Sequence, residues 1–198
     1  MGRVPTVGLT GGLGAGKSTA LAALERLGAA TLSTDAVVHE LYAAPEVRDA
    51  VVARWGGRVA PDGVVDRAAV AARAFAAPEE RAWLESELWP RVGRRVAAWL
   101  QEVADHDPPP VAAVVETPLL FEAGMDGVYD ATVAVVADEE VRAARAAVRG
   151  QVAADERAAR QLPQAEKARR ATFVVDNSGT KADLEHQLSA ILATLVSS

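Results

Sequence analysis

The sequence contains no cysteine, and this absence excludes disulfide bonds and thiolate metal sites. It also contains no uninterrupted apolar run long enough for the core of a signal peptide or for a membrane span. We therefore expect a cytoplasmic protein with no membrane partner.

Lysine and asparagine are scarce as well. The 198 residues include 18 arginines but only three lysines (Lys17, Lys167 and Lys181) and a single asparagine, Asn177. A scarce residue at a chemically meaningful place carries more weight than a common one. The net charge of -6 argues against binding to nucleic-acid phosphates, although a small polyanionic ligand can still bind in a locally basic pocket.

Apolar runs predict five short strands, separated by segments of helical period. Strands that alternate with helices indicate a parallel sheet with helices on both faces, in an α/β fold. A chain of this length suits one domain, 1–198, and the middle of the chain, about 47–105, has no convincing strand run. We interpret it as a helical insert between the second and third strands. The predicted strands are Thr6–Thr10, Ala30–Ser33, Val111–Val115, Ala131–Val136 and Phe173–Val175.

The predicted helices carry recognisable start and stop signals. Asp66 is a candidate N-cap for a helix that extends to Phe75, and Pro78 opens the next helix. Pro90 should interrupt that helix, after which another begins. The four tryptophans are expected in the core rather than as base-stacking groups. Further helices are predicted over Ala36–Ala43, Asp138–Arg149 and Lys181–Leu195.

The segment Gly11–Thr19 satisfies the pattern G-x-x-x-x-G-K-[ST] of a phosphate-binding loop. Its glycines allow successive backbone N–H groups to surround phosphate oxygens, and the following helix adds its positive end. A chance match in a glycine-containing turn is the alternative, but the strand before the pattern and the helix after it argue against that. The residues expected to bind ATP are Gly12, Gly14, Ala15, Gly16, Lys17, Ser18 and Thr19, with Lys17 on the β- and γ-phosphates and Ser18 on Mg²⁺.

The rest of the chain narrows the class of nucleotide-binding protein. A GTPase requires an N-K-x-D motif, and the only asparagine, Asn177, is followed by Ser178. The chain is also short for a motor ATPase. A small-molecule kinase is therefore favoured.

Several further blocks carry a resemblance to one family. They are Thr10–Ser18, Thr34-Asp35, Val65-Asp66-Arg67 with Val70, Phe75, Pro90, Pro118-Leu119-Leu120-Phe121-Glu122 and Asp176-Asn177-Ser178-Gly179. In order and spacing, these blocks resemble the dephospho-CoA kinase family over nearly the whole chain. The resemblance implies phosphorylation of the 3′-hydroxyl of dephospho-CoA by ATP, the last step of coenzyme A synthesis. It also implies a P-loop NTPase fold with a nucleotide-binding core, a helical substrate region and a short lid at about 149–167.

The resemblance assigns roles that compete with simpler interpretations. Asp35 orients or deprotonates the acceptor hydroxyl, or it only caps the helix that starts at Ala36. Asn177 contacts the adenine of ATP, or it belongs to a helix-capping turn. Arg145 and Arg149 clamp the transferred phosphoryl group, or they form a solvated helix face, and Arg157 and Arg160 are weaker candidates.

Acceptor binding is assigned to Asp35, Arg67, Pro118 and Leu119. Glu116 ends a strand and is a candidate to hold a magnesium-bound water, although such an acid is often structural.

Two residues and one segment depart from the family pattern. Ser33 replaces the first of two family aspartates, Trp89 replaces a histidine before Pro90, and the segment 149–161 is a few residues short. Another P-loop kinase acting on a nucleoside or nucleotide therefore remains an alternative, as does a nucleotide-binding regulator without catalysis.

Overall fold

A computed structural model describes residues 3–147 and 161–197. The described residues fall into two compact units, divided between Ser33 and Thr34 and again between Trp99 and Leu100. The second unit, Thr34–Trp99, lies between the second and third strands of the chain. The proposed bounds of the insert remain predictions. Most of the predicted lid, residues 148–160, lies outside the described residues.

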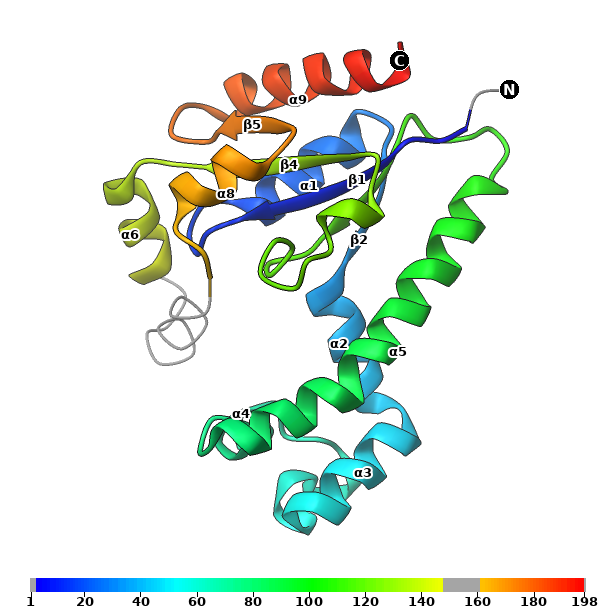
Figure 1. The fold of residues 1–198 in the computed structure, drawn as a ribbon, viewed down its shortest axis with the longest axis vertical. Coiled ribbons are helices and arrows are strands. Elements are labelled where there is room, and N and C mark those ends of the chain that lie inside the picture. The colour runs from blue at the N-terminus through cyan, green and yellow to red at the C-terminus, as the bar shows by residue number, and fades with distance from the viewer. Residues whose placement is uncertain (1–2, 148–160, 198) are drawn as a thin grey trace. The chain divides into compact units, whose positions relative to one another are not determined.

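A five-stranded parallel sheet forms the centre of the first unit, with strand order β2-β3-β1-β4-β5 (Figure 1). This arrangement confirms the predicted fold class. In the middle of the sheet, Leu9 of β1 pairs with Glu116 of β3 on one side and with Val133 of β4 on the other. The strands are β1 (Thr6–Gly11), β2 (Ala30–Ser33), β3 (Ala113–Glu116), β4 (Ala131–Val136) and β5 (Phe173–Asp176).

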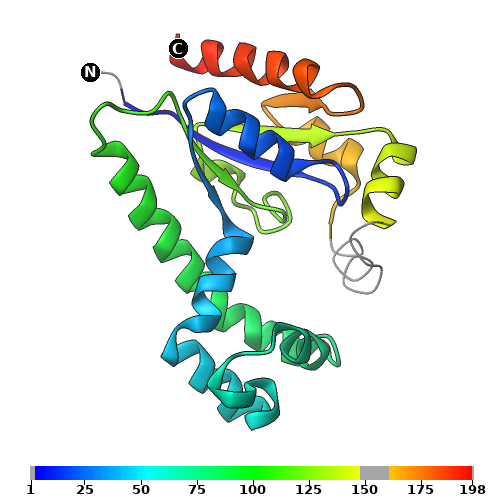
Figure 2. The same cartoon turned by 180° about the vertical axis from the view of Figure 1, so that it is seen from behind.

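Helices cover both faces of this sheet, which explains why its three central strands, β3, β1 and β4, are buried over almost their whole length. α1 (Lys17–Arg26) and α9 (Lys181–Val196) pack against each other on one face, and α8 (Gln164–Arg170) packs against β1 and β4 on the other (Figures 1 and 2). α6 (Glu139–Ala147) and the 3₁₀ turn η3 (Asp126–Val128) complete the described helices of this unit. α8 was not predicted, because seven residues are too few to show a helical period.

The third strand begins two residues later than predicted, at Ala113. The amide of Val111 donates to the carbonyl of Gly28, in the turn after α1, and is therefore not part of the ladder with β1. Side chains of the strands and of α1 and α9 form one continuous hydrophobic core. Its members include Val7, Leu9, Leu24, Val114, Val133, Val135, Val175, Leu184 and Leu188.

The second unit is helical. Its small core contains Val51, Val59 and Val70, with Trp55 and Trp83 packed against it. The two indole rings meet edge to face at 4.9 Å, and Trp55 Nε1 donates to Glu80 at 2.7 Å. The helices are α2 (Thr34–Ala43), α3 (Pro45–Trp55), η1 (Gly57–Val59), η2 (Pro61–Gly63), α4 (Arg67–Ala74) and α5 (Pro78–Ala104), the last of which extends into the first unit.

Two predictions about α5 are wrong. The helix does not end at Pro90, although proline removes a donor and disturbs the preceding turn. Residues on both sides of Pro90, namely Leu88, Val96 and Val103, are buried along α5, and this packing outweighs the loss of one helical hydrogen bond. Trp89 is 52% exposed instead of buried, because its neighbour Leu88, 6% exposed, takes the inward position of this turn.

Within residues 3–147 and 161–197, none of the helices has both the length and the apolar character needed to cross a bilayer.

The predicted cap of α4 is confirmed. The Asp66 carboxylate accepts from the amides of Ala68 and Ala69 at 2.9 and 3.2 Å. Replacing Asp66 by alanine should reduce the free energy of unfolding by about 1 kcal/mol, because the first-turn amides lose their acceptor. Asp66→Asn keeps a side-chain acceptor and should remain near wild type in the same denaturant titration. Equal losses in both variants would show that the cap is not the cause.

Candidate functional site

Residues 12–16 connect β1 to α1 and form the loop that the glycine pattern predicts. Gly14 and Gly16 have φ angles of 73° and 93°, in the left-handed region that glycine enters without Cβ strain. The loop is tightly curled, since the amide of Ala15 donates back to the carbonyl of Gly12 at 3.2 Å. A side chain at Gly14 or Gly16 would also meet the carbonyl of Arg142 or the amide of Asn177.

The start of α1 is suited to an anion. Its N-cap is Gly16, no side chain among the described residues caps it, and no acidic residue lies in its first turn. α9, in contrast, begins with a capping box made by Thr180 and Asp183. The uncapped N–H groups of α1 and the positive end of its dipole therefore remain available to phosphate oxygens.

The predicted catalytic lysine lies along this loop. Lys17 Nζ donates to the carbonyl of Gly11 at 3.0 Å and to that of Gly12 at 3.4 Å. Ser18 is exposed and Thr19 is half-buried in the first turn of α1. The structure thus brings together the predicted phosphate-binding residues, Gly12, Gly14, Ala15, Gly16, Lys17, Ser18 and Thr19.

The Asn177 side chain binds a backbone carbonyl of the phosphate loop. Its side chain is buried, and its amide nitrogen donates to the carbonyl of Ala15 at 2.8 Å. Its backbone N–H donates to Val136, which fixes the residue at the carboxyl end of the sheet. The adenine contact remains a prediction, but the nitrogen of this side chain already binds the loop. The capping role belongs to Thr180, three residues later.

Two arginines of α6 contact the same region. Arg145 donates to the carbonyl of Asn177 at 3.1 Å, and its other terminal nitrogen is buried without a hydrogen-bond partner among the described residues. Arg142 donates to the carbonyl of Leu13 at 3.1 Å and pairs with Glu139 at 2.6 Å. The sequence analysis missed Arg142, although its i, i+3 spacing from Arg145 places both on neighbouring positions of the helix surface.

The other predicted arginines of this region, Arg149, Arg157 and Arg160, lie outside the described residues. Their roles remain predictions.

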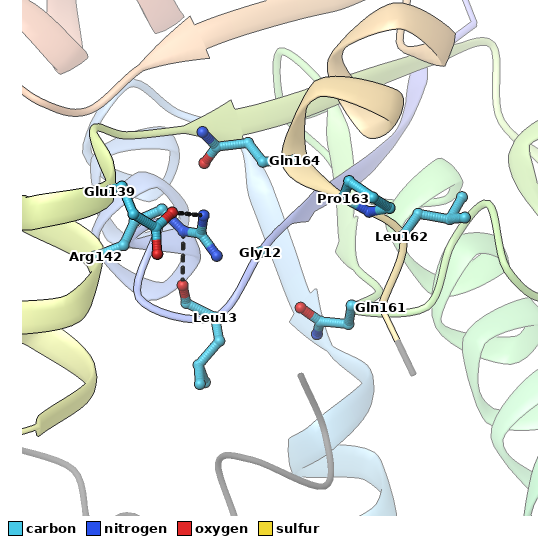
Figure 3. Close-up of a pocket in the computed structure, with 8 residues that line it drawn as sticks. All are labelled: Gly12, Leu13, Glu139, Arg142, Gln161, Leu162, Pro163 and Gln164. Atoms are coloured by element: carbon cyan, nitrogen blue, oxygen red, sulfur yellow. Dashed lines mark hydrogen bonds and ion pairs between the residues drawn. The ribbon is translucent and has the colours of Figure 1, made fainter. Parts of the chain in front are cut away.

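A cavity of about 360 Å³ opens beside the loop (Figure 3). It is within the size range of small-ligand sites, and its walls come from the loop, from α6 and from the segment that leads into α8. Arg142 and its ion-pair partner Glu139 both line one wall. The lining residues are Gly12, Leu13, Glu139, Arg142, Gln161, Leu162, Pro163 and Gln164.

The carboxyl ends of β2 and β3 hold a buried acid. Glu116 is 8% exposed and accepts from Ser33 Oγ at 2.7 Å. Parallel strands end at the same edge of a sheet, so this carboxylate lies at the edge where β1 enters the phosphate loop. No group of three acidic or histidine side chains that could by itself hold a metal occurs among the described residues.

Pro118 and Leu119 lie in the turn after β3. The carbonyl of Pro118 accepts from Lys167 Nζ at 2.6 Å and from Thr10 Oγ1 at 3.4 Å.

The acceptor-side candidates Asp35 and Arg67 belong to the second unit. α2 begins at Thr34, one residue before Asp35, so Asp35 lies in the first turn. His39 follows four residues later, on the same helix face, and its Nδ1 binds the guanidinium of Arg67 at 3.0 Å. The second unit therefore presents an acid, an imidazole and an arginine close to one another.

Comparisons with known proteins agree on one family. A family model described as dephospho-CoA kinase matches residues 5–183. A dephospho-CoA kinase from Chromobacterium violaceum is 42% identical over 194 residues, covering 94% of this chain and 92% of its own.

Solved structures agree with the fold. A crystal structure from Thermus thermophilus is 34% identical, with a TM-score of 0.74, and covers 98% of this chain and 99% of its own. A dephospho-CoA kinase from Campylobacter jejuni shares the fold at 22% identity, with a TM-score of 0.70 and 97% of both chains covered.

Asn177→Ala should weaken ATP binding about tenfold, because the carbonyl of Ala15 loses a buried hydrogen bond and the loop loses its support. Titration of the purified variant with ATP and with GTP measures both dissociation constants. If the side chain also reads adenine, the preference for ATP should fall together with the affinity.

Ser178→Ala is the matched control, since Ser178 bonds to Asp176 and Asp138 and not to the loop. Wild-type affinity for ATP in Asn177→Ala would contradict the supporting role.

Proposed function

The chain belongs to the dephospho-CoA kinase family, and on this premise we propose how its residues transfer the γ-phosphoryl group of ATP to the 3′-hydroxyl of dephospho-CoA. The transfer completes the synthesis of coenzyme A. The observation that carries this function is the family match over residues 5–183, which includes the phosphate loop and the Asn177 segment.

ATP binds with its phosphates in the loop of residues 12–16 and at the uncapped start of α1. Lys17 leaves the carbonyls of Gly11 and Gly12 and moves its ammonium group onto the β- and γ-phosphates. Negative charge shifts toward the leaving β-phosphate as the γ-phosphoryl group departs, so a cation held there stabilises the transition state more than the ground state. The contacts of Lys17 with two loop carbonyls support this assignment, because they hold its amine at the loop.

Mg²⁺ is part of the proposal. When bound, it neutralises phosphate charge and orients the β- and γ-phosphates. The donors fit its preference for oxygen: Ser18 offers an exposed hydroxyl, and Glu116 offers a carboxylate at the adjacent sheet edge. Ser18 would bind the ion directly, and Glu116 would hold one of its waters. The bond from Ser33 leaves the second oxygen of Glu116 for that contact.

The acceptor is handled by other residues. Asp35 orients the 3′-hydroxyl and accepts its proton, and Arg67 binds the pyrophosphate through its guanidinium fork. The contact of its guanidinium with Nδ1 of His39, at 3.0 Å, supports this role, because the partner in that contact is an imidazole ring and not a carboxylate. Pro118 and Leu119 border the acceptor.

Arg145 and Arg149 clamp the transferred phosphoryl group. The buried nitrogen of Arg145 that lacks a partner among the described residues supports a phosphate contact for this side chain.

The proposal also includes a cytoplasmic location and the absence of nucleic-acid partners. The lack of cysteine and the net charge of -6 support these two statements respectively.

Dephospho-CoA should be a far better acceptor than AMP or adenosine. Binding energy from the pantetheine arm helps to align the ribose, so a truncated acceptor should lose kcat as well as affinity. The test compares kcat/KM for the three acceptors at saturating ATP and Mg²⁺, with Lys17→Ala as the background. Equal values, or a preference for AMP, would assign the chain to another nucleotide kinase. ATP binding without any transfer would indicate a regulator.

Asp35→Asn should lower kcat about 100-fold or more, because the amide keeps the size of the side chain but cannot accept the proton. The melting temperature should change little, since a charge in the first turn of an exposed helix contributes only about 0.3–1 kcal/mol. Glu40→Gln makes the same chemical change further along α2 and should keep full activity. A collapsed melting temperature with full activity of the folded fraction would reduce Asp35 to a structural role.

A further inference from the structure

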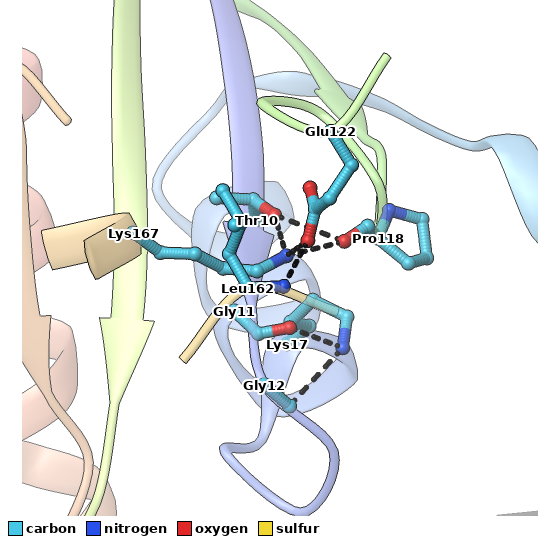
Figure 4. Close-up of polar contacts among 8 residues, drawn as sticks. All are labelled: Thr10, Gly11, Gly12, Lys17, Pro118, Glu122, Leu162 and Lys167. Carbon is cyan, nitrogen blue, oxygen red and sulfur yellow. Dashed lines mark hydrogen bonds and ion pairs between the residues drawn. The ribbon is translucent and has the colours of Figure 1, made fainter. Parts of the chain in front are cut away.

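Lys167 is the one lysine of the chain that is fully buried, and it lies on α8 and has no role in the function proposed above. Its Nζ pairs with Glu122 Oε1 at 2.9 Å and donates to the carbonyl of Pro118 at 2.6 Å and to Thr10 Oγ1 at 3.3 Å (Figure 4). Burial lowers the pKa of Lys167, and the contact with Glu122 opposes that shift. An ammonium group at this depth needs all three contacts.

This ion pair connects three distant segments of the first unit. Thr10 belongs to β1 and is 157 residues from Lys167 in the sequence, while Pro118 lies in the turn after β3. The same Glu122 oxygen also accepts from the amide of Leu162 at 2.7 Å. One carboxylate and one ammonium group thus fix β1, the β3 turn and the entry to α8 at a single point.

That point lies directly under the phosphate loop. Thr10 precedes Gly11, whose carbonyl accepts from Lys17 Nζ at 3.0 Å. Leu162 lines the cavity of Figure 3 together with Gly12. A shift of the ion pair therefore moves both the residue that holds the catalytic ammonium group and a wall of the cavity.

The hydrogen bonding of the Lys167–Glu122 ion pair is incomplete, so stability alone does not explain why the pair is present. Glu122 Oε2 is buried without a hydrogen-bond partner among the described residues. Taking two charges out of water costs more than such incomplete pairing returns, and apolar side chains of similar volume often stabilise as well or better. Its connections to the loop supply a different reason for its presence.

We propose that Lys167 and Glu122 are positioning residues for phosphoryl transfer: their ion pair holds the end of β1, and through it Lys17, in the geometry that receives ATP. This proposal rests on the function proposed above. Neither residue touches the reacting atoms, so both act through Thr10, Gly11 and the cavity wall at Leu162.

The test separates positioning from stability by replacing the whole pair. Lys167→Met and Glu122→Leu singly leave one buried charge without a partner and should lower the melting temperature. The double variant Lys167→Met/Glu122→Leu removes both charges and should recover most of it. Its kcat should nevertheless stay about tenfold or more below wild type, with a raised KM for ATP and a nearly unchanged KM for dephospho-CoA. A double variant with recovered melting temperature and kcat within about twofold of wild type would overturn the proposal.

If the double variant does not fold, two variants that each remove a single hydroxyl group test the positioning role instead. Thr10→Val removes only the hydroxyl that Lys167 contacts, and Thr6→Val makes the same change at the other end of β1, where the hydroxyl binds Asp130. We expect Thr10→Val to lower kcat/KM for ATP several-fold and Thr6→Val to leave it unchanged. Equal effects, or none, would refute the positioning role.

The dissociation constant of ATP, measured on the same variants without an acceptor, keeps the two proposals separate. Wild-type protein that binds ATP but does not phosphorylate dephospho-CoA would refute the proposed function alone. Weaker ATP binding in Thr10→Val than in Thr6→Val would still support the positioning role in that case. Equal ATP binding in the two variants would count against it.

Discussion

The start of α1 has to keep its amide groups free of the chain's own side chains, because those amides are what a phosphate group binds. Two other helices occupy these amides with a capping side chain, α4 with Asp66 and α9 with Thr180. α1 has glycine at its cap instead. The loop must therefore be stabilised through its carbonyl groups, and other segments of the first unit supply these contacts.

Support comes from two strands on the same side of β1, its neighbour β4 and the edge strand β5 beyond it. β4 leads into α6, whose Arg142 covers the carbonyl of Leu13, and β5 leads into Asn177, which binds the carbonyl of Ala15. These contacts occupy loop carbonyls and leave the amides to the ligand.

Local patterns in the sequence predicted most of the fold. Runs of valine and alanine indicated the strands, and Asp66 indicated the start of α4, because strand burial and helix capping depend on neighbouring residues. The phosphate loop was predictable for the same reason. Pro90 was misleading, because α5 packs on both sides of it through Leu88, Val96 and Val103, and a rule for a single residue does not include such packing.

The parts of the site that the sequence did not predict depend on distant contacts. Asn177 and Ala15 are 162 residues apart, and nothing in either segment reveals that they meet. Lys167 stood out as a scarce residue, but its buried contacts with Glu122 and Thr10 follow only from the packing of α8 on the sheet. The role of Asp35 was left between two alternatives, and both stay predictions, although α2 begins at Thr34 and places Asp35 in its first turn.

The distribution of aromatic side chains has a practical consequence. All four tryptophans, Trp55, Trp83, Trp89 and Trp99, belong to the second unit, and the unit with the phosphate loop has none. Intrinsic tryptophan fluorescence therefore reports on the helical unit alone. Trp89, half in solvent, is open to collisional quenchers, whereas Trp55 and Trp83 are partly buried and less accessible to them. The protein thus carries its own optical label on one unit, and a nucleotide analogue that fluoresces at longer wavelength would report separately on the other.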